Sequence, residues 1–157
     1  MASQLRMDLQ IKKLHNNELL QFLELIRLFE DVFEMQDFKM PDEKYLQRLL
    51  SSDGFFVFVA IQDNKIVGGL TSYIMHQYYS EAPLVYIYDL AVKGKMQYQG
   101  IGKKLIAANN EYCKSIGAEV VMVEADEVDE HAIKFYRSTG AKGLKVVHFD
   151  YELGRPT

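Results

Sequence analysis

The sequence has little cysteine, since Cys113 is the only one among 157 residues. A disulfide framework within the chain is therefore excluded. Long apolar runs are missing too, and the most apolar stretch, residues 55–61, is far too short to cross a bilayer. Residues 1–6 are followed by charged residues rather than by the apolar core of a signal peptide. These features predict a cytoplasmic protein without a membrane partner.

Blocks of positive charge are also missing. The chain carries 18 lysines and arginines against 22 aspartates and glutamates, for a formal net charge of −4. Because nucleic-acid binding depends on clustered positive charge, no nucleic-acid partner is expected, and a cationic ligand suits the chain better. The four histidines lie far apart without metal-ligand spacing, so no metal site is predicted. They are His15, His76, His131 and His148.

The composition is that of an ordinary soluble globular protein. Apolar residues make up 48% of the chain and charged residues 25%, which argues against disorder, collagen-like repeats and coiled coil. The length suits one compact domain, so residues 1–157 are predicted to form a single domain.

Periodicity predicts a mixed α/β chain. Helices are expected from about residue 16 to 33, from Pro41 to about residue 50, from the glycines near residue 100 to Gly117, and over residues 129–139. Strands are expected at residues 8–14, 55–62, 66–78, 84–92 and 119–125, with a final strand or hairpin at 144–153. The pair Asp63-Asn64 is typical of a tight turn between two antiparallel strands.

A glycine-rich turn precedes the third helix. Gly100-Ile101-Gly102 follows the strand at residues 84–92 and leads directly into that helix. Glycine lets the backbone approach a ligand closely, and the first amides of a helix favour anions such as phosphate oxygens. Lys103 and Lys104 add positive charge beside those amides. The turn therefore predicts a phosphate-binding site.

The chain resembles the GNAT superfamily of acetyltransferases in two motifs. Gln97-x-x-Gly100-x-Gly102, preceded by Asp89-Leu90-Ala91-Val92, resembles the motif that binds the coenzyme A pyrophosphate in that superfamily. Residues 130–140 resemble its late helix, whose Phe-Tyr pair corresponds to Phe135 and Tyr136. Further segments are similar to the class I aminoglycoside 3-N-acetyltransferases, namely residues 86–92, 124–126 and 148–150.

The resemblance implies a fold and a cofactor. The fold is α/β (α+β), with a mixed, mostly antiparallel sheet splayed between its fourth and fifth strands and about four flanking helices. Acetyl-coenzyme A is expected in that split. The residues expected to bind it are Leu90, Ala91, Val92, Gln97, Tyr98, Gln99, Gly100, Ile101, Gly102, Lys103, Asp129 and Phe135. Many superfamily members have Arg where Gln97 or Gln99 stands, and frequently Asn where Asp129 stands.

The resemblance also implies direct acetyl transfer to an amine. A backbone amide near residues 90–92 would stabilise the oxyanion, and Tyr136 would protonate the departing thiolate or hydrogen-bond to it. Asp89 interrupts an otherwise apolar strand just before that segment. It is predicted to handle the amine, by orienting it through water or as a base if burial raises its pKa. The alternative is a structural carboxylate bonded to local backbone amides.

Two further pairs of carboxylates suit a polycationic acceptor. Glu124 and Asp126 alternate along the expected fifth strand, and Asp150 and Glu152 alternate along the last one. Each pair would share one strand face and attract amines, or would form the solvated face of its strand. Cys113 is assigned to packing. The aromatic residues Tyr73, Tyr78 and Tyr79 are compatible with core, dimer surface or acceptor-site wall.

These features together predict an acetyl-coenzyme A-dependent N-acetyltransferase whose acceptor is a small polycationic amine, with the 3-amino group of an aminoglycoside as the specific candidate. The resemblance also suggests a homodimer. The alternatives are acetylation of a polyamine or of a protein amine, and a non-catalytic acyl-coenzyme A sensor that keeps Gly100 and Gly102 without using Asp89 or Tyr136.

Overall fold

The computed structural model describes residues 8–155. They divide between Glu124 and Ala125 into two compact units, which are described separately below. The single domain expected over residues 1–157 stays a prediction.

The first unit contains a five-stranded sheet in the order β1-β2-β3-β4-β5. The pairs β1–β2, β2–β3 and β3–β4 are antiparallel, and β4 pairs with β5 in parallel. The strands are β1 (Gln10–Lys13), β2 (Phe55–Gln62), β3 (Lys65–Met75), β4 (Leu84–Val92) and β5 (Val120–Val123). The helices are α1 (Leu19–Val32), α2 (Glu43–Leu50), the short 3-10 helix η1 (Gly94–Met96) and α3 (Ile101–Ser115).

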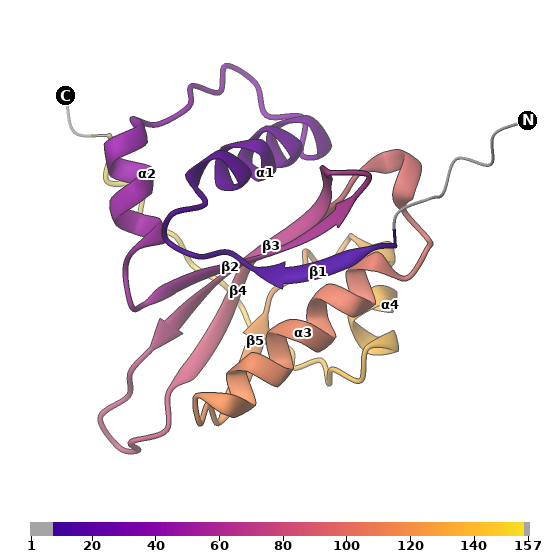
Figure 1. Ribbon diagram of the computed structural model, residues 1–157. Coiled ribbons are helices and arrows are strands. Elements are labelled where there is room, and N and C mark those ends of the chain that lie inside the picture. Colours follow the sequence, from indigo (N-terminus) through magenta and orange to yellow (C-terminus); the bar gives the residue numbers. More distant parts are fainter. Residues whose placement is uncertain (1–7, 156–157) are drawn as a thin grey trace, which may run out of the picture. The chain divides into compact units, whose positions relative to one another are not determined.

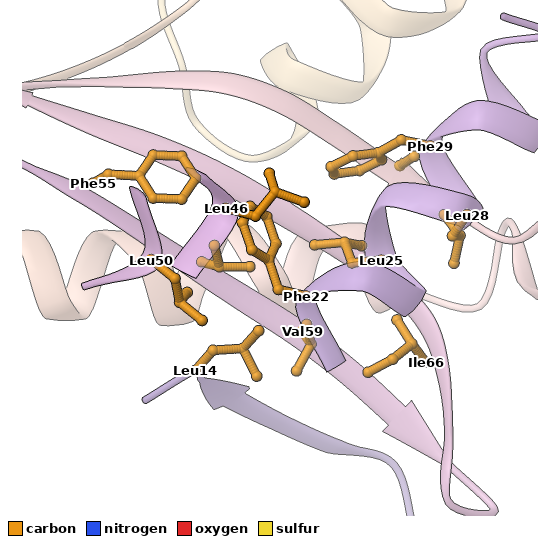
Figure 2. Close-up of a cluster of buried hydrophobic side chains, with 12 residues drawn as sticks. Leu14, Phe22, Leu25, Leu28, Phe29, Leu46, Leu50, Phe55, Val59 and Ile66 are labelled. Carbon is orange, nitrogen blue, oxygen red and sulfur yellow. The ribbon is translucent and has the colours of Figure 1, made fainter. Parts of the chain in front are cut away.

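Helices cover both faces of this sheet, with α1 and α2 on one face and α3 on the other (Figure 1). Alternation along β2 supplies both faces with apolar side chains. Phe55, Val57 and Val59 join the buried cluster under α1 and α2, part of which Figure 2 shows. Phe56 and Phe58 face α3, where their rings lie 4.8 and 6.1 Å from the Tyr112 ring. A strand buried on both faces explains the continuous apolar run in the sequence.

Local side-chain chemistry fixes the ends of two elements. The Asp42 carboxylate accepts a hydrogen bond from the Lys44 amide at 2.8 Å and so caps α2. Asp63 and Asn64 both have positive φ, at 51° and 61°, as the two central residues of a type I′ hairpin turn require. The predicted tight turn between β2 and β3 is therefore confirmed.

Helix α1 approaches the sheet closely at Gly69 in β3. A β-carbon at this position would lie 2.5 Å from a methyl carbon of Leu25 and 2.8 Å from the Phe58 carbonyl oxygen. Glycine is therefore required here by space, and Leu25 is fully buried above it.

Strand β4 departs from regular pairing on both of its edges. Its pairing with β5 covers only Leu84 to Ile87, so the edge of the remaining residues that faces away from β3 has no strand partner in residues 8–155. On the β3 side, Ser72 pairs with Ile87 and Thr71 pairs with Asp89. Tyr88 is the extra residue of a β-bulge. The predicted splay between the fourth and fifth strands is confirmed.

The second unit contains one helix, α4 (Glu130–Ser138), among its described residues. Asp129 caps it, because its carboxylate accepts a hydrogen bond from the Ala132 amide at 2.9 Å. The expected strand or hairpin at residues 144–153 is wrong, since the structure assigns no strand there. A strand exists only as part of a hydrogen-bonded ladder, and no described residue supplies a partner. The large apolar side chains of residues 144–153 are 75% or more exposed, namely Leu144, Val146, Val147, Phe149, Tyr151 and Leu153.

Between residues 8 and 155 no helix is both long and apolar enough to span a bilayer.

Candidate active site

The N-terminus of α3 presents free backbone donors next to open space. Gly100 is the N-cap residue, with φ 79°, and no side chain caps the helix. The first hydrogen bond within the helix runs from the Lys104 amide to the Gly100 carbonyl, at 3.1 Å. The three amides before Lys104 therefore have no acceptor within the helix. A β-carbon added at Gly100 would meet nothing within 4 Å, so these amides suit the phosphate oxygens of a nucleotide.

The loop before α3 is held by two glutamine side chains. The Gln97 side-chain amide donates to the Val92 carbonyl at 3.2 Å, and the Gln99 side-chain amide donates to the Lys95 carbonyl at 3.4 Å. Tyr98 lies between them with φ 64° and is 86% exposed. These contacts give both glutamines a structural role in shaping the loop. Direct contact of the three residues with the cofactor stays a prediction.

The last residues of β4 offer backbone rather than side chains. Ala91 is buried and belongs to the apolar cluster under α1, opposite Gly69. Leu90 pairs with Leu70, which lies on the α3 face. Because β5 does not extend alongside Leu90 to Val92, that edge has no strand partner in residues 8–155 and can take an extended ligand, although the Val92 carbonyl already accepts from Gln97. The geometry therefore fits the predicted role of these residues.

Asp89 is a half-buried carboxylate without a bonding partner. It pairs with Thr71 in the ladder and so lies on the sheet face that α1 and α2 cover. Within residues 8–155, no hydrogen bond or ion pair to its carboxylate is present. Burial raises the pKa of Asp89, because an unpaired charge is disfavoured away from water. The alternative in which it bonds local backbone amides therefore finds no support in this structure.

Tyrosine side chains surround Asp89 on the same face. Tyr73 pairs with Tyr86 across β3 and β4, and the ring of Tyr88 lies 5.8 Å from that of Tyr73. Burial, with smaller contributions from Tyr45, Tyr88 and Asp89, raises the pKa of Tyr73. The pKa of Tyr86 is raised as well. The phenols of Tyr73 and Tyr86 are therefore protonated at neutral pH.

Glu124 lies beside Tyr86, because it directly follows Val123, the residue of β5 that pairs with Ile87. Burial is the main cause of the raised pKa of Tyr86, and the Glu124 carboxylate, which accepts a hydrogen bond from its hydroxyl, raises it further. The strand expected at residues 119–125 ends at Val123, so Glu124 follows it directly. The idea that Glu124 and Asp126 share a strand face is therefore wrong. Asp126 belongs to the second unit and accepts a hydrogen bond from the Val128 amide at 3.4 Å.

The remaining predicted residues belong to the second unit. The rings of Phe135 and Tyr136 lie 5.1 Å apart in α4, and Asp129 caps that helix. Asp150 forms a pair with His148 at 2.8 Å, and Glu152 is exposed. Asp150 and Glu152 do not lie on a strand, which removes the argument that they share a strand face. The functional roles of these residues stay predictions.

Sequence reasoning missed three of the tyrosines at this face. Tyr86 and Tyr88 are two residues apart in the expected strand, so period-two alternation was a signal that they share a face. Tyr45 carried no such signal, because its place depends on how α2 packs on the sheet. Tyr78 and Tyr79, which had been grouped with Tyr73, are instead exposed after β3 and contact each other at 4.2 Å.

The single thiol takes no part in this site. Cys113 is 1% exposed, and burial raises its pKa to about 11. Because the thiolate is the reactive form, a buried thiol of this kind is inert, and the assignment of Cys113 to packing is confirmed. Over residues 8–155, no group of three or more potential ligands could hold a metal ion.

Comparison with known proteins identifies the family. The acetyltransferase (GNAT) family model matches residues 22–141. A crystal structure of the aminoglycoside acetyltransferase meta-AAC0020, from an uncultured soil metagenomic sample and in complex with sisomicin, is 56% identical, with a TM-score of 0.91, covering 93% of this chain and 97% of that chain. No match was found among curated proteins.

Two further structures share the fold. The aminoglycoside acetyltransferase HMB0005, from an uncultured soil metagenomic sample, is 33% identical, with a TM-score of 0.88, covering 94% of this chain and 100% of that chain. The aminoglycoside N-acetyltransferase AAC(6')-Iy in complex with CoA is 18% identical, with a TM-score of 0.78, covering 98% of this chain and 100% of that chain. The chain therefore belongs to the acetyltransferase (GNAT) family and is an enzyme that uses acetyl-coenzyme A.

Proposed function

We propose that this enzyme acetylates an amino group of an aminoglycoside, with the 3-amino group as the position. The observation that carries the proposal is Asp89, a half-buried carboxylate that no described residue pairs. A carboxylate in such a place needs a cation, and a polyamine-like sugar supplies several. The 56% identical meta-AAC0020 is an aminoglycoside acetyltransferase, which supports the same acceptor class.

The donor site follows from α3 and the end of β4. The free amides before Lys104, together with Lys103 and Lys104, provide donors and positive charge for the pyrophosphate. The unpaired edge of Leu90 to Val92 would hold the extended pantetheine arm by backbone hydrogen bonds. When bound, acetyl-coenzyme A supplies an activated acetyl group as a thioester.

Asp89 would prepare the amine for attack. An ammonium group must lose a proton before its nitrogen can attack a carbonyl carbon. Burial raises the pKa of Asp89 and so makes it a better proton acceptor than an ordinary aspartate, either directly or through water. The neutral nitrogen then forms a bond to the acetyl carbon, and backbone amides near Leu90 to Val92 stabilise the charge on the carbonyl oxygen.

Tyr136 would act on the leaving group. As the carbon–sulfur bond breaks, the sulfur takes up a proton, and the phenol of Tyr136 is the candidate donor. With ordinary phenol and thiol pKa values that transfer is uphill by about 2 kcal/mol. The step therefore helps only when bond cleavage drives it, and a hydrogen bond from Tyr136 to the sulfur is the alternative role.

Two further features belong to the proposal. The enzyme is assigned to the cytoplasm, which suits its free buried thiol. It is also proposed to be a homodimer, as the resemblance to the class I aminoglycoside 3-N-acetyltransferases suggests. Size-exclusion chromatography with light scattering measures that state directly.

An acceptor screen tests the function. Acetyl-coenzyme A is mixed with sisomicin, gentamicin, spermidine or a basic peptide, and the released thiol is measured. Fastest release with the aminoglycosides is expected, and NMR of the product then identifies the acetylated nitrogen. Faster release with spermidine or with the peptide would favour a polyamine or protein acetyltransferase. Cofactor binding without thiol release from any amine would favour a non-catalytic sensor.

A further inference from the structure

Four tyrosines on the face shared with Asp89 form a connected group, which we call the tyrosine platform: Tyr45, Tyr73, Tyr86 and Tyr88. The ring of Tyr88 lies 5.8 Å from that of Tyr73, at an interplanar angle of 76°, and 6.2 Å from that of Tyr86, at 86°. Tyr45, from α2, is close enough to Tyr73 to influence its ionisation. The platform therefore joins residues of three elements, α2, β3 and β4.

The platform is fixed to the hydrophobic core. The Tyr73 ring lies 5.1 Å from that of Phe55, which in turn lies 5.8 Å from that of Phe22. Both phenylalanines are buried in the cluster that Figure 2 shows. These rings are tilted against each other, at interplanar angles of 56° and 49°, and such contacts are favourable and limit the orientation of each ring. A ligand on the platform would therefore meet rings that are already in place, which lowers the entropy lost on binding.

The outer rings of the platform nevertheless face solvent. Tyr88 is 62% exposed and Tyr45 is 51% exposed. Tyr88 is the extra residue of the bulge in β4, and such bulges re-aim side chains at the cost of regular pairing. An aromatic residue that is directed outward by an irregularity, beside a carboxylate that lacks a partner, indicates a binding surface rather than a packing position.

Negative charge borders the platform on two sides. Asp89 follows Tyr88 directly and is half-buried. Glu124 accepts a hydrogen bond from the Tyr86 hydroxyl. Aromatic faces attract cations as well as the apolar faces of ring compounds. A molecule that carries ammonium groups on a saturated ring matches both properties.

We propose that the tyrosine platform is the specificity surface on which a ring of the aminosugar acceptor rests, with ammonium groups directed at Asp89 and Glu124. This inference rests on the acceptor class proposed above. The C–H face of the sugar ring packs against the exposed ring of Tyr88, and the phenolic hydroxyl of Tyr73 is available to the sugar hydroxyls.

Kinetics of Tyr88 variants test the platform. Tyr88→Leu is expected to raise the KM for sisomicin roughly 3- to 30-fold, the range for loss of a cation–π contact, with an unchanged KM for acetyl-coenzyme A. Tyr88→Phe keeps the ring and is expected to remain within about twofold of the parent enzyme. Tyr78→Leu is the matched control, because Tyr78 is 93% exposed and contacts only the neighbouring Tyr79 ring among the described aromatics.

Binding provides a readout that does not depend on turnover. The chain has 10 tyrosines and no tryptophan, so its intrinsic fluorescence comes from tyrosine. Titration with sisomicin is expected to change that emission in the parent enzyme and in Tyr78→Leu. In Tyr88→Leu, the same change is expected to need a higher concentration of sisomicin.

The platform and the proposed function can fail separately. If the enzyme acetylates sisomicin while Tyr88→Leu and Tyr45→Leu keep the parental KM, the platform is wrong and the function stands. If no amine is acetylated, the proposed function is wrong and the titration decides on the platform. In that case, weaker binding of sisomicin by Tyr88→Leu than by the parent enzyme would support the platform. Equal binding by the two proteins, or no binding by the parent enzyme, would overturn it.

Discussion

The Ser72 hydroxyl donates a hydrogen bond to the Asn109 side-chain oxygen over 2.8 Å, and neither residue is exposed to solvent. Ser72 lies in β3 opposite Ile87, next to the bulge, and Asn109 lies in the middle of α3. The Asn109 amide also donates to Asn110 at 3.3 Å and to the Cys113 sulfur at 3.7 Å. This bond therefore joins α3, which carries the proposed phosphate site, to β3, which pairs with the strand that carries Asp89.

Removal of the Ser72 hydroxyl is expected to destabilise the protein. In Ser72→Ala the Asn109 oxygen loses its partner in a dry environment, which costs about 1–3 kcal/mol of unfolding free energy. Urea denaturation measures the change. Ser52→Ala, at an exposed serine, is the matched control and is expected to stay within about 0.5 kcal/mol of the parent. Equal midpoints for the two variants would show that the buried bond contributes nothing.

The close approach of α1 predicts a penalty for any side chain at Gly69. In Gly69→Ala the new methyl group would overlap Leu25 and the Phe58 carbonyl, and relief of such overpacking costs about 1–3 kcal/mol. Gly94→Ala is the control, because a β-carbon there would meet nothing within 4 Å. Thermal melting compares them, and a melting temperature for Gly69→Ala at or above that of Gly94→Ala would contradict the packing seen here.

Asp89 is expected to lower stability at neutral pH. Burial raises the pKa of Asp89 in the folded state, so the folded state binds the proton more tightly than the unfolded state. The resulting contribution to the free energy of unfolding is complete only below the ordinary aspartate pKa of about 4. It is lost as the pH rises through the raised pKa. Asp89→Asn should therefore raise the melting temperature at pH 7, and the gain should shrink as the pH falls. The same change should lower kcat/KM for the acceptor.

The control for this pH dependence is Asp31→Asn, at an exposed aspartate of α1. It is expected to change neither the melting temperature nor the kinetics. A lower melting temperature of Asp89→Asn at pH 7 would instead indicate that the carboxylate makes a stabilising bond, and would return Asp89 to a structural role.

Two substitutions at Gly100 separate charge from shape in the phosphate site. Asp and Asn have nearly the same size and both tolerate the left-handed conformation that φ 79° requires. Gly100→Asp places a negative charge near the phosphate, so its Kd for acetyl-coenzyme A is expected to exceed that of Gly100→Asn about tenfold. Isothermal titration calorimetry measures both, and equal Kd values would place the pyrophosphate elsewhere.

Tyr136→Phe tests the leaving-group role. Loss of the phenolic hydroxyl is expected to lower kcat about tenfold or more, as loss of a general acid does, while the Kd for acetyl-coenzyme A stays unchanged. Tyr79→Phe removes the hydroxyl of a 75% exposed tyrosine and should behave as the parent enzyme. A weaker Kd with an unchanged kcat would assign Tyr136 to cofactor binding alone.

Much of the fold could be predicted because the relevant signals are local. The aromatic and β-branched runs at residues 55–62 and 84–92 have the same bounds as β2 and β4, since each is flanked by turn residues. The pair Asp63-Asn64 and the glycine before α3 were equally informative, because both positions need positive φ. The proposed phosphate site could be predicted for the same reason, because its donors are consecutive backbone amides.

The proposed acceptor surface could be predicted only in part, because its geometry depends on pairing between strands. Asp89 was recognisable as a charge within an apolar run, but the bulge at Tyr88 is a property of β3 and β4 together. Alternation suggested a strand at residues 144–153, yet alternation describes side chains and not a hydrogen-bonding partner. Tyr45 reaches the site through helix packing, for which no local pattern exists.

The extra residue in β4 shifts the pairing register between β3 and β4 by one position. If Tyr88 paired with Thr71, each later residue would move by one position, and Asp89 would stand opposite the fully buried Leu70, on the face that α3 covers. The extra residue thus keeps Asp89 on the face of the sheet where the proposed acceptor surface lies. A change of register of this kind would carry Asp89 away from the face on which the tyrosine platform lies.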